Sequence, residues 1–236
     1  MEKYDIAYIL KNDIKPEELR YSLRSLDNFP HGRVFFYGGK PEGLEPDVMV
    51  HFTQTGNSKY ARALTSFDFM CNDERLSDDF WLFNDDFFVM RPVTEYETPY
   101  DETLFEKIIR IEDKYRHKTA YSEMLRRGAK WLRDNGYDVK NYALHMPMLL
   151  NKEKLKAILP DLQGLPLRSI YGNVYGTGVV NRRDVKIQDL EKIPAPDADF
   201  LSTSDKSFKR GKVGEYIRNY FTEKSIYEVD NDEKND

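Results

Sequence analysis

A short polar triplet inside an apolar stretch is the strongest candidate for chemistry in this chain. Asn84-Asp85-Asp86 separates two apolar runs, Phe80–Phe83 and Phe87–Met90. Two adjacent carboxylates at the end of a buried strand repel each other and are costly to desolvate, and a bound divalent cation relieves both costs. Oxygen ligands in a chain whose single cysteine is Cys71 indicate Mg²⁺ or Mn²⁺ rather than zinc. We therefore predict a metal site at Asp85 and Asp86, which are also the candidate catalytic residues.

The local conformation of the triplet decides which carboxylate would contact the ion. In an extended strand, neighbouring side chains point to opposite faces, so Asn84 and Asp86 share a side and Asp85 points away. That alternation favours Asp86 as the direct ligand if the triplet is extended. The alternative is a corner between two strands, because Asn and Asp are common turn residues.

His145 is a candidate third ligand of the same ion. It precedes Met146 and Pro147 within the apolar run Ala143–Leu150. A neutral imidazole nitrogen would complete the metal site. A histidine whose hydrogen bonds are satisfied inside the core explains the same pattern.

A second candidate site lies where a predicted helix begins, in the segment Gly56–Arg62. Helix N-termini bind phosphate through their free N–H groups and the helix dipole. Lys59 and Arg62 add two positive charges that would hold a nucleotide diphosphate. A capped helix with a solvated basic face is the competing interpretation.

The elements that would position these residues alternate between strand and helix. Strands are predicted at 4–10, 33–37 and 47–53, and a helix begins at Pro16 and ends before Pro30. Strand, helix, strand indicates a βαβ unit and hence a parallel sheet. A helix over 58–71 and strands on both sides of the triplet follow. Parallel sheets bind ligands beyond the carboxyl ends of their strands, and the triplet falls at such an end.

The rest of the chain is predicted to be more helical. Helices are expected at 102–114, 117–135 and 212–221, an extended run at 143–150, a short helix capped by Asn151, and a loop at 164–178. No repeat or linker divides the chain. We expect one α/β domain over residues 1–227, with a mostly parallel central sheet flanked by helices, and a disordered acidic tail over 228–236.

Charge and composition exclude several classes of protein. The net charge is −5, but the tail contributes five acids against one lysine, which leaves −1 for residues 1–227. A nearly neutral body argues against a non-specific nucleic-acid binder. One cysteine excludes a disulfide framework, a zinc ribbon and an iron–sulfur cluster. Without a signal region or a membrane span, the sequence predicts a soluble cytoplasmic protein.

Common catalytic motifs are also missing. The glycines at 172, 176 and 178 do not have the dinucleotide-binding spacing, and Arg210-Gly211-Lys212 lacks the other residues of a phosphate-binding P-loop. No G-x-S-x-G motif is present, so a hydrolase with a serine nucleophile elbow is not indicated.

Two segments together resemble a known family. Leu19–Leu26 (LRYSLRSL) and Phe83–Val93 (FNDDFFVMRPV) are similar, in order and spacing, to conserved blocks of the Stealth proteins. These are bacterial capsular-polysaccharide sugar-phosphate transferases. Asn57-Ser58 and His145-Met146-Pro147 resemble further parts of the pattern. More broadly, an Asp-rich triplet that ends a strand resembles the metal motif of GT-A-fold nucleotide-sugar glycosyltransferases.

The resemblance implies a nucleotide-diphosphate sugar as donor and a glycan or other hydroxyl compound as acceptor, with Mn²⁺ or Mg²⁺ neutralising the diphosphate. Asp86 would hold the ion, with Asp85 nearby and His145 completing its ligands. Asp13 would contact the base or ribose. The other candidate donor-binding residues are Asn57, Lys59, Arg62 and Asn84.

The sequence departs from the Stealth pattern in three places. Ile9–Asp13 stands where a Trp-Val-Asp block is expected, and the chain is shorter than those transferases. Phe200–Phe208 resembles a late Asn-Asp block only loosely, with Asp205 at the matching position. Whether sugar or sugar phosphate is transferred is therefore open.

Two other functions remain compatible with the sequence. The first is a glycosyltransferase that modifies nucleic-acid bases, which would need a basic groove made from Arg126, Arg127, Lys130, Arg133, Arg182 and Arg183. The second is a non-catalytic carbohydrate- or partner-binding domain. In that case Asp85→Asn and Asp86→Asn would change the stability of the protein but would not affect any enzymatic turnover.

Overall fold

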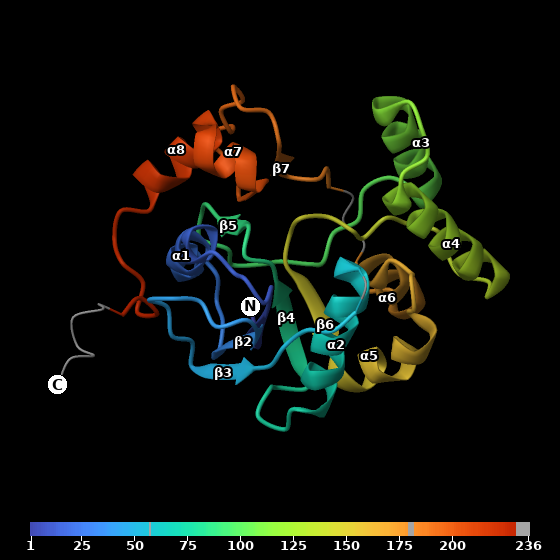
Figure 1. The fold of residues 1–236 in the computed structure, drawn as a ribbon, viewed down its shortest axis with the longest axis horizontal. Helices are drawn as coiled ribbons and strands as arrows, with labels where there is room; N and C mark the ends of the chain where they lie inside the picture. Colours follow the sequence, from blue (N-terminus) through green and yellow to red (C-terminus); the bar gives the residue numbers. More distant parts are fainter. Residues whose placement is uncertain (57, 179–181, 230–236) are drawn as a thin grey trace.

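The computed structural model describes residues 1–56, 58–178 and 182–229 (Figure 1). The chain opens with the predicted βαβ unit. Strand β1 (Asp5–Leu10) leads to helix α1 (Pro16–Arg24) and the 3-10 turn η1 (Ser25–Asn28), and β2 (Val34–Gly38) then pairs parallel with β1. Pro16 stands at the start of α1, where its missing N–H costs no hydrogen bond.

Two sheets meet at the polar triplet. Strand β3 (Val48–His51) extends the parallel sheet, and β4 (Asp79–Phe83) pairs parallel with β1 on its other side. Strand β6 (Met148–Asn151) closes that sheet antiparallel to β4, so the order is β3-β2-β1-β4-β6. Strand β5 (Phe87–Val89) leaves it and joins a second, three-stranded sheet, β5-β8-β7.

Helices cover both faces of the larger sheet. On one face lie α2 (Lys59–Asn72), α3 (Leu104–Tyr115), α4 (Ala120–Asp134), α5 (Lys152–Ile158), η2 (Leu159–Asp161) and α6 (Leu167–Tyr175), and α1 covers the other. Strand alternation explains why, since Phe35 and Phe80 point into the first layer while Phe36 and Trp81 point into the second. The predicted α/β class with a mostly parallel sheet is confirmed.

The carboxyl-terminal part packs on the smaller sheet. Strands β7 (Lys186–Ile187) and β8 (Phe200–Thr203) are followed by α7 (Asp205–Arg210) and α8 (Lys212–Tyr220), which lie together at the top of the view in Figure 1, over β5 and α1. Phe88 of β5 and Phe208 of α7 stack with ring centroids 5.8 Å apart in this third core cluster.

The sequence prediction was wrong for part of this half of the chain. The predicted loop over 164–178 contains α6, because Leu167, Ile170, Tyr171 and Val174 recur at helical spacing and pack into the core, and Gly172 lets the helix pack on the ring of Tyr142. Strand β8 and helix α7 were not predicted. Other predicted helices are confirmed to within a few residues, and the Asn151 side chain caps α5 as expected.

The ordered body extends past residue 227. Glu228 accepts hydrogen bonds from Arg20 and Arg24 of α1, and Val229 N–H donates to Gly43 O. The predicted boundary of the tail therefore lies at least two residues too early, and residues 230–236 are outside the described part of the chain. None of the helices in the described residues is both long enough and apolar enough to span a bilayer.

The ion pairs of Glu228 give a prediction about stability and pH. Its side chain is 2% exposed, and Glu228→Gln removes the charge that Arg24 contacts at 2.7 Å and Arg20 at 2.8 Å. We expect the free energy of unfolding at pH 7, from urea denaturation, to fall by about 2 kcal/mol.

Lowering the pH should remove the stabilisation that the Glu228 ion pairs contribute. Burial opposes ionisation of Glu228, but hydrogen bonds from Arg24 and Arg20 outweigh it and lower its pKa from 4.5 to about 2. A carboxyl with a lowered folded-state pKa stabilises the fold above its unfolded pKa, so the difference between wild type and variant should shrink as pH falls from 4.5 towards 2. Glu153→Gln, at an exposed position of α5, is the control. A constant difference over that range would show that Glu228 does not act through these pairs.

Candidate functional site

The triplet forms the corner between the two sheets. Strand β4 ends at Phe83 and β5 begins at Phe87, whose N–H donates to Asn84 O at 3.2 Å across a tight turn. Strand alternation therefore does not hold within the triplet, and the prediction based on it, which favoured Asp86, is corrected. In the turn, Asp85 and Asp86 have different surroundings.

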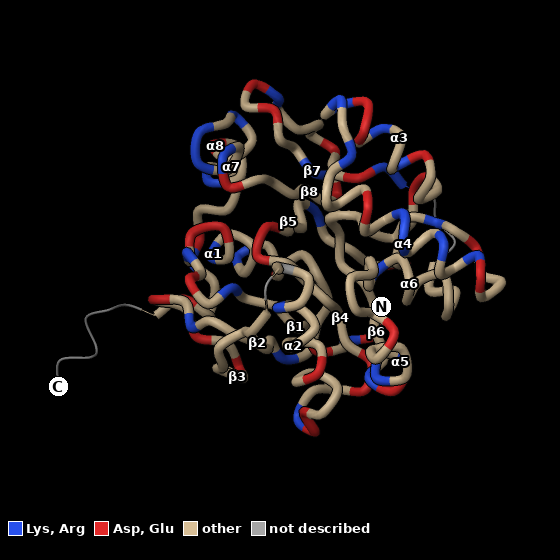
Figure 2. The backbone as a smooth tube through the Cα atoms, turned by 45° about the vertical axis from the view of Figure 1, so that its right-hand side comes forward, with Lys and Arg blue, Asp and Glu red and all other residues tan. Residues whose placement is uncertain are grey.

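Asp85 lines a small acidic cavity of about 100 Å³ at the carboxyl ends of β1 and β4. Segments far apart in the sequence build this acidic cavity, and the red stretches of α1, the turn before β5 and the start of α7 lie near one another in Figure 2. Five acids and three lysines line it, with a net charge of −2 if all are ionised. The lining residues are Lys11, Asp13, Ile14, Lys15, Glu17, Glu18, Asp85, Asp205 and Lys209.

Two carboxyls of this cavity resist ionisation. The pKa of Asp85 is raised from 3.8 to about 6, chiefly by burial and next by the charge of Asp86, against the opposing effect of Lys11. The pKa of Glu18 is likewise raised, from 4.5 to about 7, chiefly by burial, although Thr203 Oγ1 donates to Glu18 Oε1 at 3.0 Å. The charges of Asp85, Asp205 and Asp86 all add to that rise. The cavity therefore holds more negative charge than its own lysines neutralise.

Asp86 faces the smaller sheet. Its Oδ2 atom accepts a hydrogen bond from Lys186 Nζ of β7 at 2.7 Å, and both side chains are largely buried. Its Oδ1 atom is buried and has no hydrogen-bond partner among the described residues. Buried carboxylate oxygens nearly always have a hydrogen-bond partner, so this oxygen stands out among the groups of the corner.

Asn84 contacts a cation that the sequence did not single out. Arg168 of α6 donates to Met146 O at 2.8 Å and to Asn84 Oδ1 at 3.4 Å, and its guanidinium lies over the Phe87 ring. Burial lowers the Arg168 pKa to about 10, although the charges of Tyr96, Asp86 and Asp184 favour the cation. Arg168 is therefore a positive charge held beside the triplet.

His145 forms a carboxylate–histidine pair. Its Nδ1 atom lies 3.0 Å from both oxygens of Asp184, which also accepts from the N–H groups of His145 and Lys186. Lys107 Nζ lies 3.7 Å from the same carboxylate. Burial opposes ionisation of Asp184, but His145 and Lys107 outweigh it and hold its pKa well below the usual range. The His145 ring lies beside Phe87, directly after the triplet, and it does not line the acidic cavity.

The loop after β1 is held in place at the acidic cavity. Asp13 lines it as the sequence led us to expect, whereas Asn12 exchanges two hydrogen bonds with the backbone of Gln54. Gly38 and Gly39 make this approach possible, because a Cβ at Gly39 would lie 2.0 Å from Lys11 O. These contacts tie the ends of β1, β2 and β3 together.

The predicted phosphate-binding segment is only partly described. Asn57 lies outside the described residues, and so does the side chain of Lys59, the first residue of α2. Ser58 caps the helix by accepting a hydrogen bond from Ala61 N–H, as the competing interpretation requires. Arg62 is exposed in the first turn, and the residues that line the acidic cavity do not include it.

Sequence reasoning missed most of the partners of the triplet. Glu18 carried a signal, since it is an acid in the first turn of a helix that follows a strand end. Arg168 lay in a segment predicted to be a loop, and Lys186 is in a two-residue strand with no readable pattern. Asp184 was noted only as part of Arg182-Arg183-Asp184.

The raised pKa of Asp85 gives a second prediction. A carboxyl whose pKa is raised in the folded state lowers the free energy of unfolding when it ionises. For Asp85 this loss of stability begins at about pH 4, grows until about pH 6, and is complete at higher pH. With EDTA present, Asp85→Asn should therefore raise the melting temperature at pH 8 by about 3 °C and leave it unchanged at pH 4. Asp113→Asn, at an exposed position of α3, should change neither value. A lower melting temperature at pH 8 would contradict charge repulsion in the cavity.

Comparison with known proteins adds no family to this description. No protein-family model matches the chain, and a search of curated proteins finds no match. The function has to be argued from the site itself.

Proposed function

We propose that this chain is a GT-A-like transferase that binds a nucleotide-diphosphate sugar together with Mn²⁺ or Mg²⁺. It passes the sugar, or the sugar phosphate, to a hydroxyl group of a glycan-type acceptor. The observation that carries the proposal is the acidic cluster of Asp85, Asp86, Glu18 and Asp205 at the corner between the sheets. The resemblance of the triplet to sugar-phosphate transferases supports the donor class.

The donor atoms at the corner fit a hard divalent cation. They are carboxylate oxygens, the pKa of Asp85 and of Glu18 is raised, and Asp86 Oδ1 is buried without a partner among the described residues. In the described part of the chain, no three Asp, Glu, His or Cys side chains are already arranged to hold a metal ion. That is expected of Mg²⁺, which proteins bind through one or two carboxylates and which takes further oxygens from substrate phosphates. Asp85 and Asp86 would hold it, and the ion would neutralise charge that develops on the departing phosphate.

Cations around the triplet suit the phosphates of the donor. Lys186 and Arg168 lie on one side of it, and Lys11 and Lys209 lie at the acidic cavity on the other. Arg168 presents a planar fork of donors that matches phosphate oxygens. Lys186 can exchange its ion pair with Asp86 for a contact to phosphate. We assign these four cations to the diphosphate.

His145 is the group best placed to accept the proton of the acceptor hydroxyl. When Nδ1–H donates to Asp184, Nε2 carries the lone pair and acts as the base. We propose this role in place of metal ligation, because the ionised Asp184 orients the ring and stabilises it when protonated.

The reaction balances in either form. The acceptor oxygen forms a bond to the anomeric carbon or to the sugar-bearing phosphorus, and its proton moves to His145 Nε2. In the first case the bond from the anomeric carbon to the phosphate oxygen breaks and a nucleoside diphosphate leaves. In the second the bond between the two phosphates breaks and a nucleoside monophosphate leaves.

The structure gives less support to a nucleic-acid acceptor. The basic residues that such a groove would use are largely engaged by acids or carbonyls. Arg126 pairs with Glu112, Lys130 with Asp134, and Arg127 donates to Gly164 O. We therefore favour a glycan-type acceptor.

The third prediction tests the donor site by thermal unfolding with a panel of nucleotide sugars, each with and without Mn²⁺. We expect one nucleotide to raise the melting temperature by about 3 °C or more in the presence of Mn²⁺ and by much less in EDTA, because binding to the folded state stabilises it. Asp85→Ala and Asp86→Ala should remove the metal-dependent part. Glu153→Ala, at an exposed position of α5, should retain it. No shift with any nucleotide would contradict the proposal and favour a non-catalytic binding domain.

The fourth prediction concerns the base. Using the donor found above, donor hydrolysis or transfer should fall at least about 100-fold in Asp184→Asn. The amide side chain introduced at position 184 neither fixes the tautomer of the His145 ring nor stabilises its protonated form. The acidic limb of the pH–rate profile should therefore also move. Donor affinity, measured by the same thermal shift, should remain within about twofold of the wild-type value. Turnover within about threefold of wild type, with an unchanged profile, would exclude His145 and Asp184 from proton transfer.

A further inference from the structure

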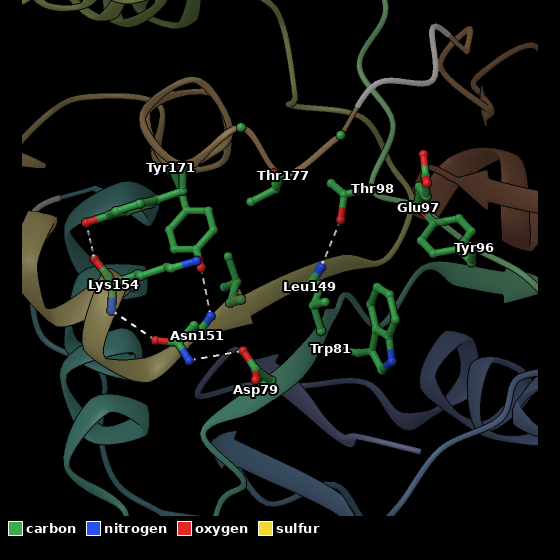
Figure 3. Close-up of a pocket in the computed structure, with 14 residues that line it drawn as sticks. Asp79, Trp81, Tyr96, Glu97, Thr98, Leu149, Asn151, Lys154, Tyr171 and Thr177 are labelled. Atoms are coloured by element: carbon green, nitrogen blue, oxygen red, sulfur yellow. Dashed lines mark hydrogen bonds between the residues drawn. The ribbon is translucent and has the colours of Figure 1, made fainter. Parts of the chain in front are cut away.

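A cavity of about 390 Å³ lies between the start of β4, strand β6 and helix α6 (Figure 3). Side chains already complete the edge of β6 there, since Leu149 N–H donates to Thr98 Oγ1 and Asn151 N–H donates to the Tyr171 hydroxyl. The residues that line this cavity include neither the triplet nor His145. The charged group that the proposed reaction leaves unexplained lies elsewhere, beside His145.

That group is a buried lysine on α3. Lys107 is 6% exposed, and the other buried residues of the helix are Leu104, Ile108 and Ile111. Lysine is almost never fully buried unless its charge is paired. An apolar side chain at position 107 would continue the buried face of α3 without the cost of desolvating a charge. Packing alone therefore does not account for a lysine at this position.

The charge of Lys107 is directed at Asp184. Its Nζ atom lies 3.7 Å from Asp184 Oδ2, and Asp101 attracts it from further away. The other contacts of Asp184 are of a different kind. His145 Nδ1 lies 3.0 Å from both carboxylate oxygens, and the N–H groups of His145 and Lys186 donate to Oδ1. Among the described residues, Lys107 is thus the nearest permanent positive charge to this carboxylate.

Other charged and titratable groups act on Asp184 from a greater distance. Arg110 of α3, Tyr121 of α4 and Arg168 of α6 interact with it electrostatically, but in the described part of the chain none of the three is hydrogen-bonded to it or paired with it. Arg110 is paired with Glu102 and its side chain is 58% exposed, so solvent screens its charge. Removal of Lys107 should therefore change the electrostatic field at Asp184 more than removal of any of these groups.

A carboxylate beside a histidine has two opposite consequences for a base. The hydrogen bond to Asp184 fixes the tautomer of His145 that has its lone pair on Nε2, but the negative charge also favours the protonated ring. A ring that is already protonated cannot accept a proton from an acceptor hydroxyl. A fixed positive charge at Asp184 offsets the second effect, because it disfavours a further positive charge on the ring.

We propose that Lys107 is a positioning residue for the base of the transfer reaction. It neutralises part of the Asp184 charge, so that Asp184 orients the His145 ring without holding it in the protonated form. Lys107 makes and breaks no bond in the reaction. Its role in catalysis rests on the proposed function, whereas its coupling to His145 can be measured in the protein alone.

NMR measures this coupling without nucleotide, acceptor or metal. The ring C–H signals of the four histidines would be followed from about pH 5 to about pH 9, and the His145 signal is the one that His145→Gln removes. In Lys107→Met we expect the midpoint of the His145 titration to move to higher pH by about one pH unit, because a nearby positive charge is gone. Lys107→Gln, which is also uncharged, should move it in the same direction, so either neutral variant is sufficient for the test.

Two variants control for packing. Lys107→Arg keeps the charge and should leave the midpoint within about 0.3 pH unit of wild type. Lys114→Met removes an exposed lysine of the same helix and should leave it unchanged. The other three histidines should keep their midpoints in every variant, which shows that the fold is intact. An unchanged His145 midpoint in the neutral variants, or an equal shift in Lys107→Arg, would overturn the proposal.

Turnover separates this proposal from the proposed function. With the donor found by thermal shift, the acidic limb of the pH–rate profile of Lys107→Met should move to higher pH by the same amount as the NMR midpoint. A midpoint that moves while the rate profile does not would overturn the role of Lys107 in transfer. A midpoint that moves in a protein that binds no nucleotide sugar would support the coupling and overturn the transferase function.

Discussion

Repulsion among carboxylates at the corner between two sheets is the constraint on which the site depends. Asp85, Asp86, Glu18 and Asp205 come from three separate segments, and burial first, then the charge of the neighbouring carboxylates, raises the pKa of Asp85 and Glu18. A protein selected only for stability would not gather them, since each ionised carboxyl makes the next harder to ionise. The cluster persists because the surrounding cores hold the backbone in place. This excess of negative charge is the reason for which we propose a cation at this corner.

The two-sheet architecture makes the corner rigid. Strand β4 lies between β1 and β6 in the larger sheet and β5 lies in the smaller one, so the turn between them is fixed at both ends by buried aromatic side chains such as Phe83 and Phe88. The same break turns Asp85 towards β1 and α1 and Asp86 towards β7. Asp86 Oδ2 contacts Lys186, and its unpaired Oδ1 is the oxygen that would join Asp85 at the proposed cation site.

One buried polar atom without a described partner lies at the corner itself. Asp86 Oδ1 is buried beside the acidic cluster, whereas Oδ2 of the same carboxylate accepts a hydrogen bond from Lys186 Nζ. Buried polar groups are nearly always hydrogen-bonded, so the unpaired oxygen supports the proposal that a bound cation completes this corner.

Local sequence determined the first half of the fold and the centre of the site. Apolar runs of strand length, Pro16 at a helix start and the interrupted run around Asn84-Asp85-Asp86 are short-range signals, and the βαβ unit and the triplet followed from them. Helix α6 was missed because the glycines in and after it are typical of a loop. The burial of Ile170 and Tyr171 in the core outweighs the low helix propensity of glycine. Only the tertiary structure decided which side chains meet the triplet. Lys186 contacts Asp86 across 100 residues of sequence, and Thr203 contacts Glu18 across 185, because sheet pairing and core packing bring distant segments together without leaving a local pattern.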